Sequence, residues 1–391
     1  MKVTQIADLL NSTMSEVLGK DVVVSEDLTN VVDLGKEVID TDNLDNYVKK
    51  LVNHIGKVIF TNRLYKGGVP SVLMDKWEFG SILEKISADM PEAQESDSWK
   101  LTDGQSYDQD VFYQPSVSAK FFNSTVTFEI PLSFTERQVK ESFSNATQLN
   151  GFLSMLQTAV QNSLTVKIEN LIMKTMNNAI GETLNDATTN TDSVKAVNLL
   201  DMYNTNHATD QKIDSIEKAL ISPIFMRYAT YIIGMYKDRI SKISTLFNVG
   251  AKERFTPADN LHLVLLSDFA KASDVYLSSD VYHNENVKLP TYESVPFWQG
   301  SGTSYAFEDV SKIMVKTSSG ATVNQSGIIG AMFDTNAIGV SNLDQRVTTN
   351  YNAKAEFYTN FYKMDAGYYN DLNENFVVFY MALPATEPAG E

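Results

Sequence analysis

The chain contains no cysteine among its 391 residues. This absence excludes disulfide bonds, thiolate metal sites and cysteine nucleophiles. Long apolar runs are also missing, because no stretch approaches the roughly 18 apolar residues of a membrane-spanning helix. The N-terminal segment 1–21 has neither the continuous apolar run nor the cleavage site of a signal peptide. The sequence therefore predicts a soluble, cytosolic chain.

Basic residues are scarce: 32 Lys and Arg stand against 49 Asp and Glu, which gives a net charge of −17. Binding to nucleic acid depends on Lys and Arg that neutralise phosphates, so this composition argues against a general affinity for nucleic acid. Two explanations of the acidity stay open. Many soluble proteins are this acidic, and a protein that lines a container for DNA would use the same charge to avoid sticking to its contents.

Recognisable catalytic and cofactor motifs are also absent. The four histidines have no histidine partner three or four residues away, so no zinc-binding HExxH pattern occurs. There is no Walker loop and no GxSxG elbow, and Gly300-Ser-Gly302 lacks a third glycine. Asp108 and Asp110 form an acidic pair without the ligand spacing of an EF-hand. We therefore predict no catalysis, no cofactor and no metal site.

The most unusual segment runs from Asp75 to Leu132 and is predicted to be a long hairpin. One arm begins at Trp77 and Phe79, and the other is the alternating run Val126–Leu132. Between the arms, residues 89–116 carry seven acids and one base without a regular period. Ordering so long an insertion costs backbone entropy, and an exposed two-stranded arm is only marginally stable alone. We expect the hairpin to lie on a neighbouring subunit.

Aromatic side chains along this segment are the candidates for inter-subunit contact. Rings of this kind suit protein interfaces because they bury a large apolar surface. The candidates are Trp77, Phe79, Trp99, Phe112, Tyr113, Phe121 and Phe122.

The strongest periodic signal follows the hairpin. Apolar residues from Leu149 to Ile180 recur at three- and four-residue steps and predict one long helix. Thr147 is its expected cap and Gly181 its expected end, with a linker over 181–193. At about 50 Å, such a helix crosses a whole domain. A coiled-coil strand is the alternative, but the apolar stripe is wider than a strict a/d seam.

The rest of the chain mixes helical and strand patterns, which predicts an α+β protein. Helices are expected over 44–56, 194–203, 212–220 and 223–247, and strands over 261–267, 275–283, 312–317 and 327–334. The residues of segment 223–247 expected to pack inward are Tyr228, Tyr231, Ile232, Met235, Ile240 and Ile243. Aromatic residues between Tyr351 and Tyr380 fit a sheet core or an interface better than a ligand cage.

This order of parts resembles the major capsid protein of tailed bacteriophages, whose fold is named for phage Hong Kong 97. At the sequence level the chain is most similar to head proteins of small short-tailed phages of the phi-29 type. The similarity lies in 45–87, in 128–172 and in GIIGAMFDTNAIGVSN near 327–342, as diffuse patterns rather than one short motif.

The resemblance implies an α+β, Hong Kong 97-like capsid fold with six parts. They are an N-terminal arm (1–43), a segment leading into the peripheral domain (44–74), an extended loop or E-loop hairpin (75–132), a peripheral domain with a long spine helix (133–190), an axial domain (191–340), and a return to the peripheral domain with a C-terminal tail (341–391).

By the same resemblance the protein would be a structural, non-catalytic major capsid protein. It would self-assemble as pentamers and hexamers into an icosahedral shell that encloses double-stranded DNA without sequence-specific binding. A scaffolding protein and a portal are the implied partners, no membrane is involved, and assembly is expected in the host bacterial cytoplasm. Two alternatives stay open. One is an encapsulin-like nanocompartment shell, which particle contents would distinguish, and the other is a cytosolic enzyme of mixed fold.

Overall fold

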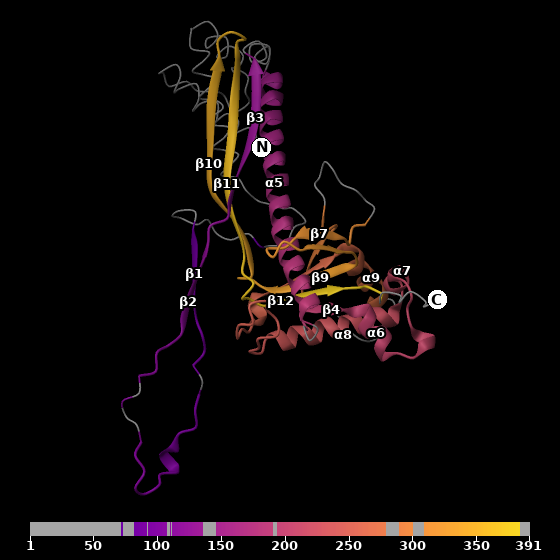
Figure 1. Cartoon of the computed structure of the whole chain (residues 1–391). Helices are drawn as coiled ribbons and strands as arrows, with labels where there is room; N and C mark the ends of the chain where they lie inside the picture. Colours follow the sequence, from indigo (N-terminus) through magenta and orange to yellow (C-terminus); the bar gives the residue numbers. More distant parts are fainter. Residues whose placement is uncertain are drawn as a thin grey trace.

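The structure is a computed structural model that combines a tall sheet-and-helix part, a wider α/β body and a projecting hairpin (Figure 1). It describes residues 72, 82–91, 93–107, 110, 112–135, 146–190, 194–278, 289–299 and 309–383. The expected N-terminal arm, the helix expected over 44–56, Trp77 and Phe79 lie outside these residues.

One helix, α5 (Ala146–Thr189), runs the length of the tall part and continues into the body (Figure 1). Its 44 residues span about 66 Å at 1.5 Å per residue. The predicted apolar stripe is confirmed where side chains are described, because its members are at most 8% exposed. They are Val160, Leu164, Ile168, Leu171, Ile172, Met176 and Ile180. The helix therefore crosses the molecule as the spacing predicted.

The predicted end at Gly181 is wrong, because α5 continues through that residue to Thr189. The first nine residues of the expected linker are therefore helical. A Cβ atom on Gly181 would overlap the Cγ2 methyl of Val315 in strand β7 (Ile313–Lys316). Glycine is present here because α5 and β7 approach closely, and it does not mark the end of the helix.

Gly181→Ala is expected to lower the free energy of unfolding by about 1–3 kcal/mol, as overpacking does. The same change at Gly234, inside α8 (Pro223–Ile240), meets nothing within 4 Å. Gly234→Ala should raise the free energy of unfolding by up to about 1 kcal/mol, the ordinary gain in helix propensity. Urea titration of both variants measures these changes in the free energy of unfolding. A neutral or stabilising Gly181→Ala would contradict the close-packing explanation.

Three long antiparallel strands form the tall sheet. The order is β10 (Ile338–Asn352), β11 (Phe357–Asn370) and β3 (Thr125–Thr135), and α5 covers one face. Tyr358 and Tyr362 are completely buried in this core, as the aromatic pattern predicted. The pairing of β3 with β11 also corrects one expectation. The run Val126–Leu132 is a strand, but it is not the second arm of the hairpin.

A five-stranded mixed sheet forms the body. Its order is β4 (Ala196–Asn198), β12 (Phe376–Tyr380), β9 (Ile328–Asp334), β5 (Leu261–Leu266) and β6 (Glu293–Val295). Val264 and Leu266 of β5 pack into the same core as α5, whereas Leu263 and Leu265 pack into the core beneath. Successive strand residues point to opposite faces, so continuous apolar runs mark a sheet covered on both sides.

The second face is covered by helices, with α8 as the longest. The others are α6 (Leu199–Asn206), α7 (Ile216–Leu220) and α9 (Ser267–Ser278), with single 3₁₀ turns at η2 (Thr209–Gln211) and η3 (Ala258–Asn260). A small hairpin of β7 and β8 (Thr322–Gln325) packs on α5.

Several local predictions in the body are confirmed and others are wrong. The strands expected over 261–267, 312–317 and 327–334 are present as β5, β7 and β9. The prediction of a strand over 275–283 is wrong for its first four residues, because 275–278 belong to helix α9. Within the helix expected over 194–203, residues 196–198 form strand β4 and α6 begins only at Leu199. The helix expected over 223–247 is α8, which ends at Ile240. Tyr231 and Ile243, expected to pack inward, are 65% and 50% exposed.

Candidate assembly surface

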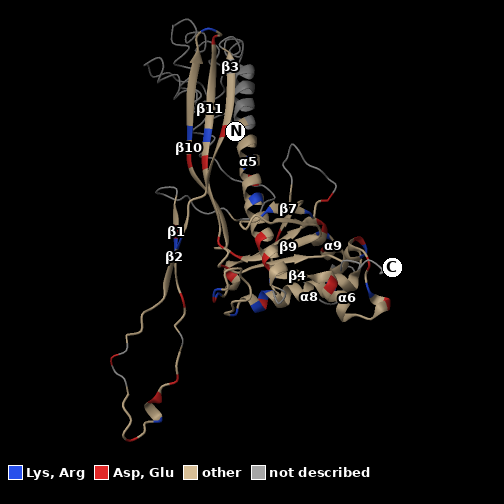
Figure 2. Ribbon diagram, viewed as in Figure 1, with Lys and Arg blue, Asp and Glu red and all other residues tan. Residues whose placement is uncertain are grey.

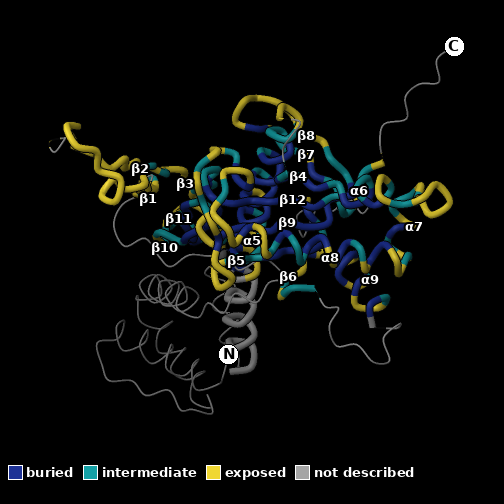
Figure 3. The backbone as a smooth tube through the Cα atoms, turned by 90° about the horizontal axis from the view of Figure 1, so that it is seen from below, coloured by how far each residue is buried: buried dark blue, intermediate teal, exposed yellow. Residues whose placement is uncertain are grey.

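A two-stranded antiparallel hairpin projects from the lower end of the tall sheet in the view of Figure 1 (see also Figure 3). It consists of β1 (Leu83–Ala88) and β2 (Val117–Phe122), with Leu83 opposite Phe122 and Ala88 opposite Val117. Exposure alternates along β1, so Leu83, Lys85 and Ser87 face the body while the residues between them face away. This alternation follows from the two-residue period of a strand.

The side of the hairpin turned away from the body, called here the outward face, is uncovered and largely apolar, with the charged Glu84 opposite Phe121. Its large side chains are between 56% and 64% exposed. They are Ile82, Ile86, Met90, Val117 and Phe121. An apolar patch rimmed by polar residues marks an interaction site more often than a scattered set of apolar residues does.

Beyond the strands, residues 90–115 form a tip that leaves from the pair Asp89 and Ser116. The amide of Asp89 donates to the carbonyl of Ser116 at 2.9 Å, which closes the hairpin. The tip contains one 3₁₀ turn, η1 (Asp97–Trp99), capped by the Ser96 hydroxyl. Trp99 is 96% exposed, and the rings of Phe112 and Tyr113 are nearly as open. The tip thus presents large aromatic groups to solvent.

The candidate contact residues occupy different surroundings. Trp99, Phe112 and Tyr113 lie in the tip, and Phe121 lies on the outward face. The ring of Phe122 points the other way and packs on Tyr369 of β11, with ring centroids 4.9 Å apart.

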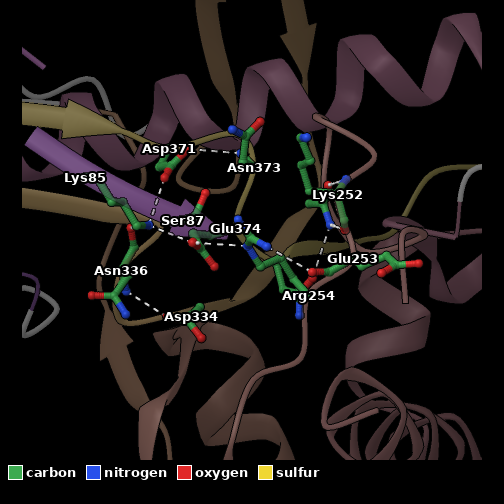
Figure 4. Close-up of polar contacts among 12 residues, drawn as sticks. Lys85, Ser87, Lys252, Glu253, Arg254, Asp334, Asn336, Asp371, Asn373 and Glu374 are labelled. Atoms are coloured by element: carbon green, nitrogen blue, oxygen red, sulfur yellow. Dashed lines mark hydrogen bonds and ion pairs between the residues drawn. The ribbon is translucent and has the colours of Figure 1, made fainter. Parts of the chain in front are cut away.

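Ion pairs attach the root of the hairpin to the turn that follows β11 (Figure 4). Lys85 Nζ lies 2.8 Å from Asp371 Oδ2 and 2.7 Å from Glu374 Oε1. Lys120 on β2 donates to Asp371 Oδ1 at 3.0 Å, so both strands hold the same carboxylate. The Asp371 side chain is only 3% exposed. We call Lys85, Lys120, Asp371 and Glu374 the root cluster.

The protonation of Asp371 determines the strength of the root cluster. Burial alone would raise the pKa of Asp371, but the hydrogen bonds and positive charges of Lys85 and Lys120 outweigh it. Its pKa is therefore lowered from the ordinary 3.8. The folded state binds this proton less readily than the unfolded chain does. The stabilisation is fully present above the unfolded pKa and is lost as pH falls through the lower folded pKa.

We expect the free-energy difference between wild type and Asp371→Asn to be constant from about pH 7 to about pH 5. It should shrink only below the ordinary pKa of 3.8. Urea titrations of both proteins at each pH measure the difference. If the difference already faded near pH 6, a group other than this carboxylate would control the attachment.

Among the residues that the structure describes, no group of three or more His, Asp or Glu side chains could hold a metal ion. No helix in this part of the chain is long and apolar enough to cross a membrane. The hairpin projects from the rest of the chain (Figure 1) and exposes apolar side chains, which suits contact with another protein.

Comparison with known families identifies the protein class. The profile of the Phi29-like phage major capsid protein family matches residues 10–380. The chain belongs to this family. It is a structural protein of a bacteriophage capsid, which builds a multimeric shell, and its place is the virion. This membership does not favour the nanocompartment or enzyme alternatives.

Solved phage capsids are similar to this capsid protein in outline. The capsid structure of Staphylococcus phage Andhra is 9% identical with a TM-score of 0.49, and the match covers 83% of this chain and 87% of that one. The capsid structure of Cyanophage P-SCSP1u is 10% identical with a TM-score of 0.46, covering 82% and 93%. Bacteriophage PhiM1 mature capsid is 6% identical with a TM-score of 0.43, covering 84% and 88%. No curated protein matches the sequence.

Sequence reasoning missed the root cluster and most of the outward face. A signal for the outward face was present, because LEKISA and VSAKFF alternate at strand spacing. That alternation also places Lys85 and Lys120 on one face. Nothing local, however, indicated that their carboxylate partners lie more than 250 residues further along the chain.

Proposed function

We propose that the β1–β2 hairpin is the arm by which each capsid subunit lies across a neighbour. The observation that supports this most is the uncovered outward face, together with the exposed rings at the tip. Among the candidate contact residues, Trp99, Phe112, Tyr113 and Phe121 keep this role, with Trp77 and Phe79 at the start of the same segment, whereas Phe122 packs within its own chain. Full burial of a side chain such as Ile86 or Phe121 contributes about 1.5–3 kcal/mol. A neighbour that covered the outward face would therefore stabilise the shell substantially.

In this proposal the chain is divided as in a Hong Kong 97-like capsid protein, and the arm is one of its parts. Residues 1–43 form an N-terminal arm, 44–74 lead into the peripheral domain and 75–132 contain the extended loop. Residues 133–190 carry the spine helix, 191–340 form the axial domain and 341–391 return to the peripheral domain. The length of α5 and its contacts with both sheets support the role of a spine.

Assembly would give pentamers and hexamers of an icosahedral shell around double-stranded DNA. Each contact can be weak, because a standard interface buries only about 1,600 Å² and a closed shell repeats it many times. The net charge of −17 suits a wall that holds DNA without binding its sequence. A scaffolding protein and a portal would be the partners, with assembly in the host bacterial cytoplasm.

The test is electron microscopy of the full chain beside a variant whose tip, residues 90–115, is replaced by Asn-Gly. Asp89 and Ser116 already form a hydrogen-bonded pair that a two-residue turn can close. We expect closed shells from the wild type and only unassembled, folded subunits from the variant. Normal shells from the variant would contradict the role of the tip.

A further inference from the structure

Basic side chains gather at one end of α8, in a chain that is acidic overall (Figure 2). Segment 237–254 carries five bases and two acids. The bases are Lys237, Arg239, Lys242, Lys252 and Arg254. We call segment 237–255, which ends at Phe255, the basic corner.

Apolar side chains alternate with these charges on the same segment. Ile243, Leu246 and Phe255 are 50%, 56% and 52% exposed, although each is large enough to be stabilised by burial. Arg239 and Lys242 have no carboxylate partner among the residues that the structure describes. The corner thus presents unpaired positive charge around an uncovered apolar centre.

The backbone of the basic corner is held in one conformation before any partner arrives. Ser244 and Arg254 exchange two backbone hydrogen bonds of 3.0 and 3.1 Å. Phe247 and Asn248 are buried beneath the loop, and Phe247 accepts from the amide of Phe376 at 2.7 Å. A surface fixed in this way loses little conformational entropy when a partner binds.

The tip of the hairpin has the complementary chemistry. The tip, residues 90–115, carries six acids and one base, and its exposed side chains include Trp99, Leu101, Phe112 and Tyr113. The tip of a chain projects away from that chain's own body (Figures 1 and 2). It therefore faces away from its own basic corner, and a second copy can supply the matching surface.

We propose that the basic corner is the docking surface for the acidic, aromatic tip of a second copy of this chain. This inference rests on the proposed function of the hairpin and specifies which surface receives it. Opposite charges fix the register of the contact, and the exposed rings cover Ile243, Leu246 and Phe255.

The root of each arm lies next to the same chain's basic corner. Lys252 pairs with Asp89 at 3.4 Å, and Arg254 lies 3.6 Å from Glu374 of the root cluster. An arriving tip would therefore dock beside the point where the receiving chain's own arm begins. Such a head-to-tail contact uses two different surfaces, and repeated contacts of this kind close into rings.

The absence of cysteine permits a direct test by cross-linking. One variant carries Phe112→Cys in the tip and Leu246→Cys in the basic corner. A matched control carries Phe112→Cys with Ile224→Cys, which is 61% exposed near the start of α8. Assembled shells of the full chain, formed with the phage's own assembly factors, are treated with a short bis-maleimide and analysed on a denaturing gel.

The tip-and-corner variant should give a ladder of linked subunits that extends beyond dimers. A single cysteine per chain can link only two chains, so Phe112→Cys alone should stop at dimers. A ladder from the Ile224→Cys control, or shells without any ladder, would overturn the corner assignment and leave the arm proposal intact. Failure of the wild type to form shells would instead overturn the proposed function and this inference with it.

Charge exchange provides the second test. Asp97, Asp103 and Asp110 are changed to Lys in the tip, and Arg239 and Lys242 to Glu in the corner. The three tip substitutions alone, or the two corner substitutions alone, should each reduce the yield of shells by about fivefold or more. A variant that carries all five should recover most of the wild-type yield. Asp210→Lys with Asp259→Lys, at exposed sites elsewhere on the body, controls for net charge. If corner reversal left shell yield unchanged but lowered packaged DNA, the corner would contact nucleic acid and the proposal would be wrong.

Discussion

Asp371→Asn is expected to reduce the yield of closed shells at least tenfold while the body stays folded. The substitution removes the charge that Lys85 on β1 and Lys120 on β2 share, and it leaves Lys85 paired with Glu374 alone. Buried charge-assisted hydrogen bonds contribute about 1.5–3 kcal/mol each. The lysine side chains are 24% and 40% exposed, and solvent screening reduces the total to about 2 kcal/mol. That energy corresponds to a roughly 30-fold greater population of detached arms.

Hydrogen exchange measures the detachment directly. Amides of β1 and β2 should exchange faster in Asp371→Asn, and those of β9 and β12 should not change. Lys218→Met is the matched control, because Lys218 pairs with Asp214 at an exposed site on α7. Loss of this exposed ion pair should lower the free energy of unfolding by less than about 0.5 kcal/mol and leave the yield of shells unchanged. Normal shell yield with unchanged exchange in Asp371→Asn would show that the root cluster does not position the arm.

Phe121→Ser is expected to prevent shell assembly without lowering the stability of the isolated subunit. Phe121 is 62% exposed in the subunit, and changes at such surface positions stay within about 0.5 kcal/mol. In the shell its ring would be buried against a neighbour, and loss of that burial removes about 2–3 kcal/mol from each contact. Sedimentation measures assembly, and urea titration measures stability.

The adjacent residue provides a control with the opposite expectation. Phe122 packs on Tyr369 of its own chain. Phe122→Ser should therefore speed hydrogen exchange in the hairpin of the isolated subunit, which Phe121→Ser should not do. If Phe121→Ser assembled normally, the outward face would not be an inter-subunit surface. Equal effects of the two variants on isolated subunits would contradict the alternation of β2.

Features with a local period were predictable from the sequence. The apolar stripe of α5 repeats every three to four residues, and strands β5, β7 and β9 have continuous or alternating apolar runs bounded by turn residues. The aromatic residues of β11 were expected in a core, where Tyr358 and Tyr362 lie. Exposed rings in the acidic tip could be singled out because large aromatic groups are unusual in a polar segment without periodic structure.

Pairing between distant segments was not predictable in the same way. Val126–Leu132 has the right spacing for a strand, but the spacing does not say which strand it joins, and the structure pairs it with β11. Gly181 resembles a helix stop in sequence, yet its role depends on Val315, which lies on a different element.

The sequence by itself determined the absence of disulfides, the acidic charge, the long helix and membership of the phage capsid family, because each depends on composition or on neighbours along the chain. The tertiary structure alone decided which face of the hairpin is uncovered and that Lys85 and Lys120 share Asp371. It also placed the Lys252–Asp89 pair beside the root cluster. These features depend on side chains that packing brings together from distant positions, and no local pattern records such contacts.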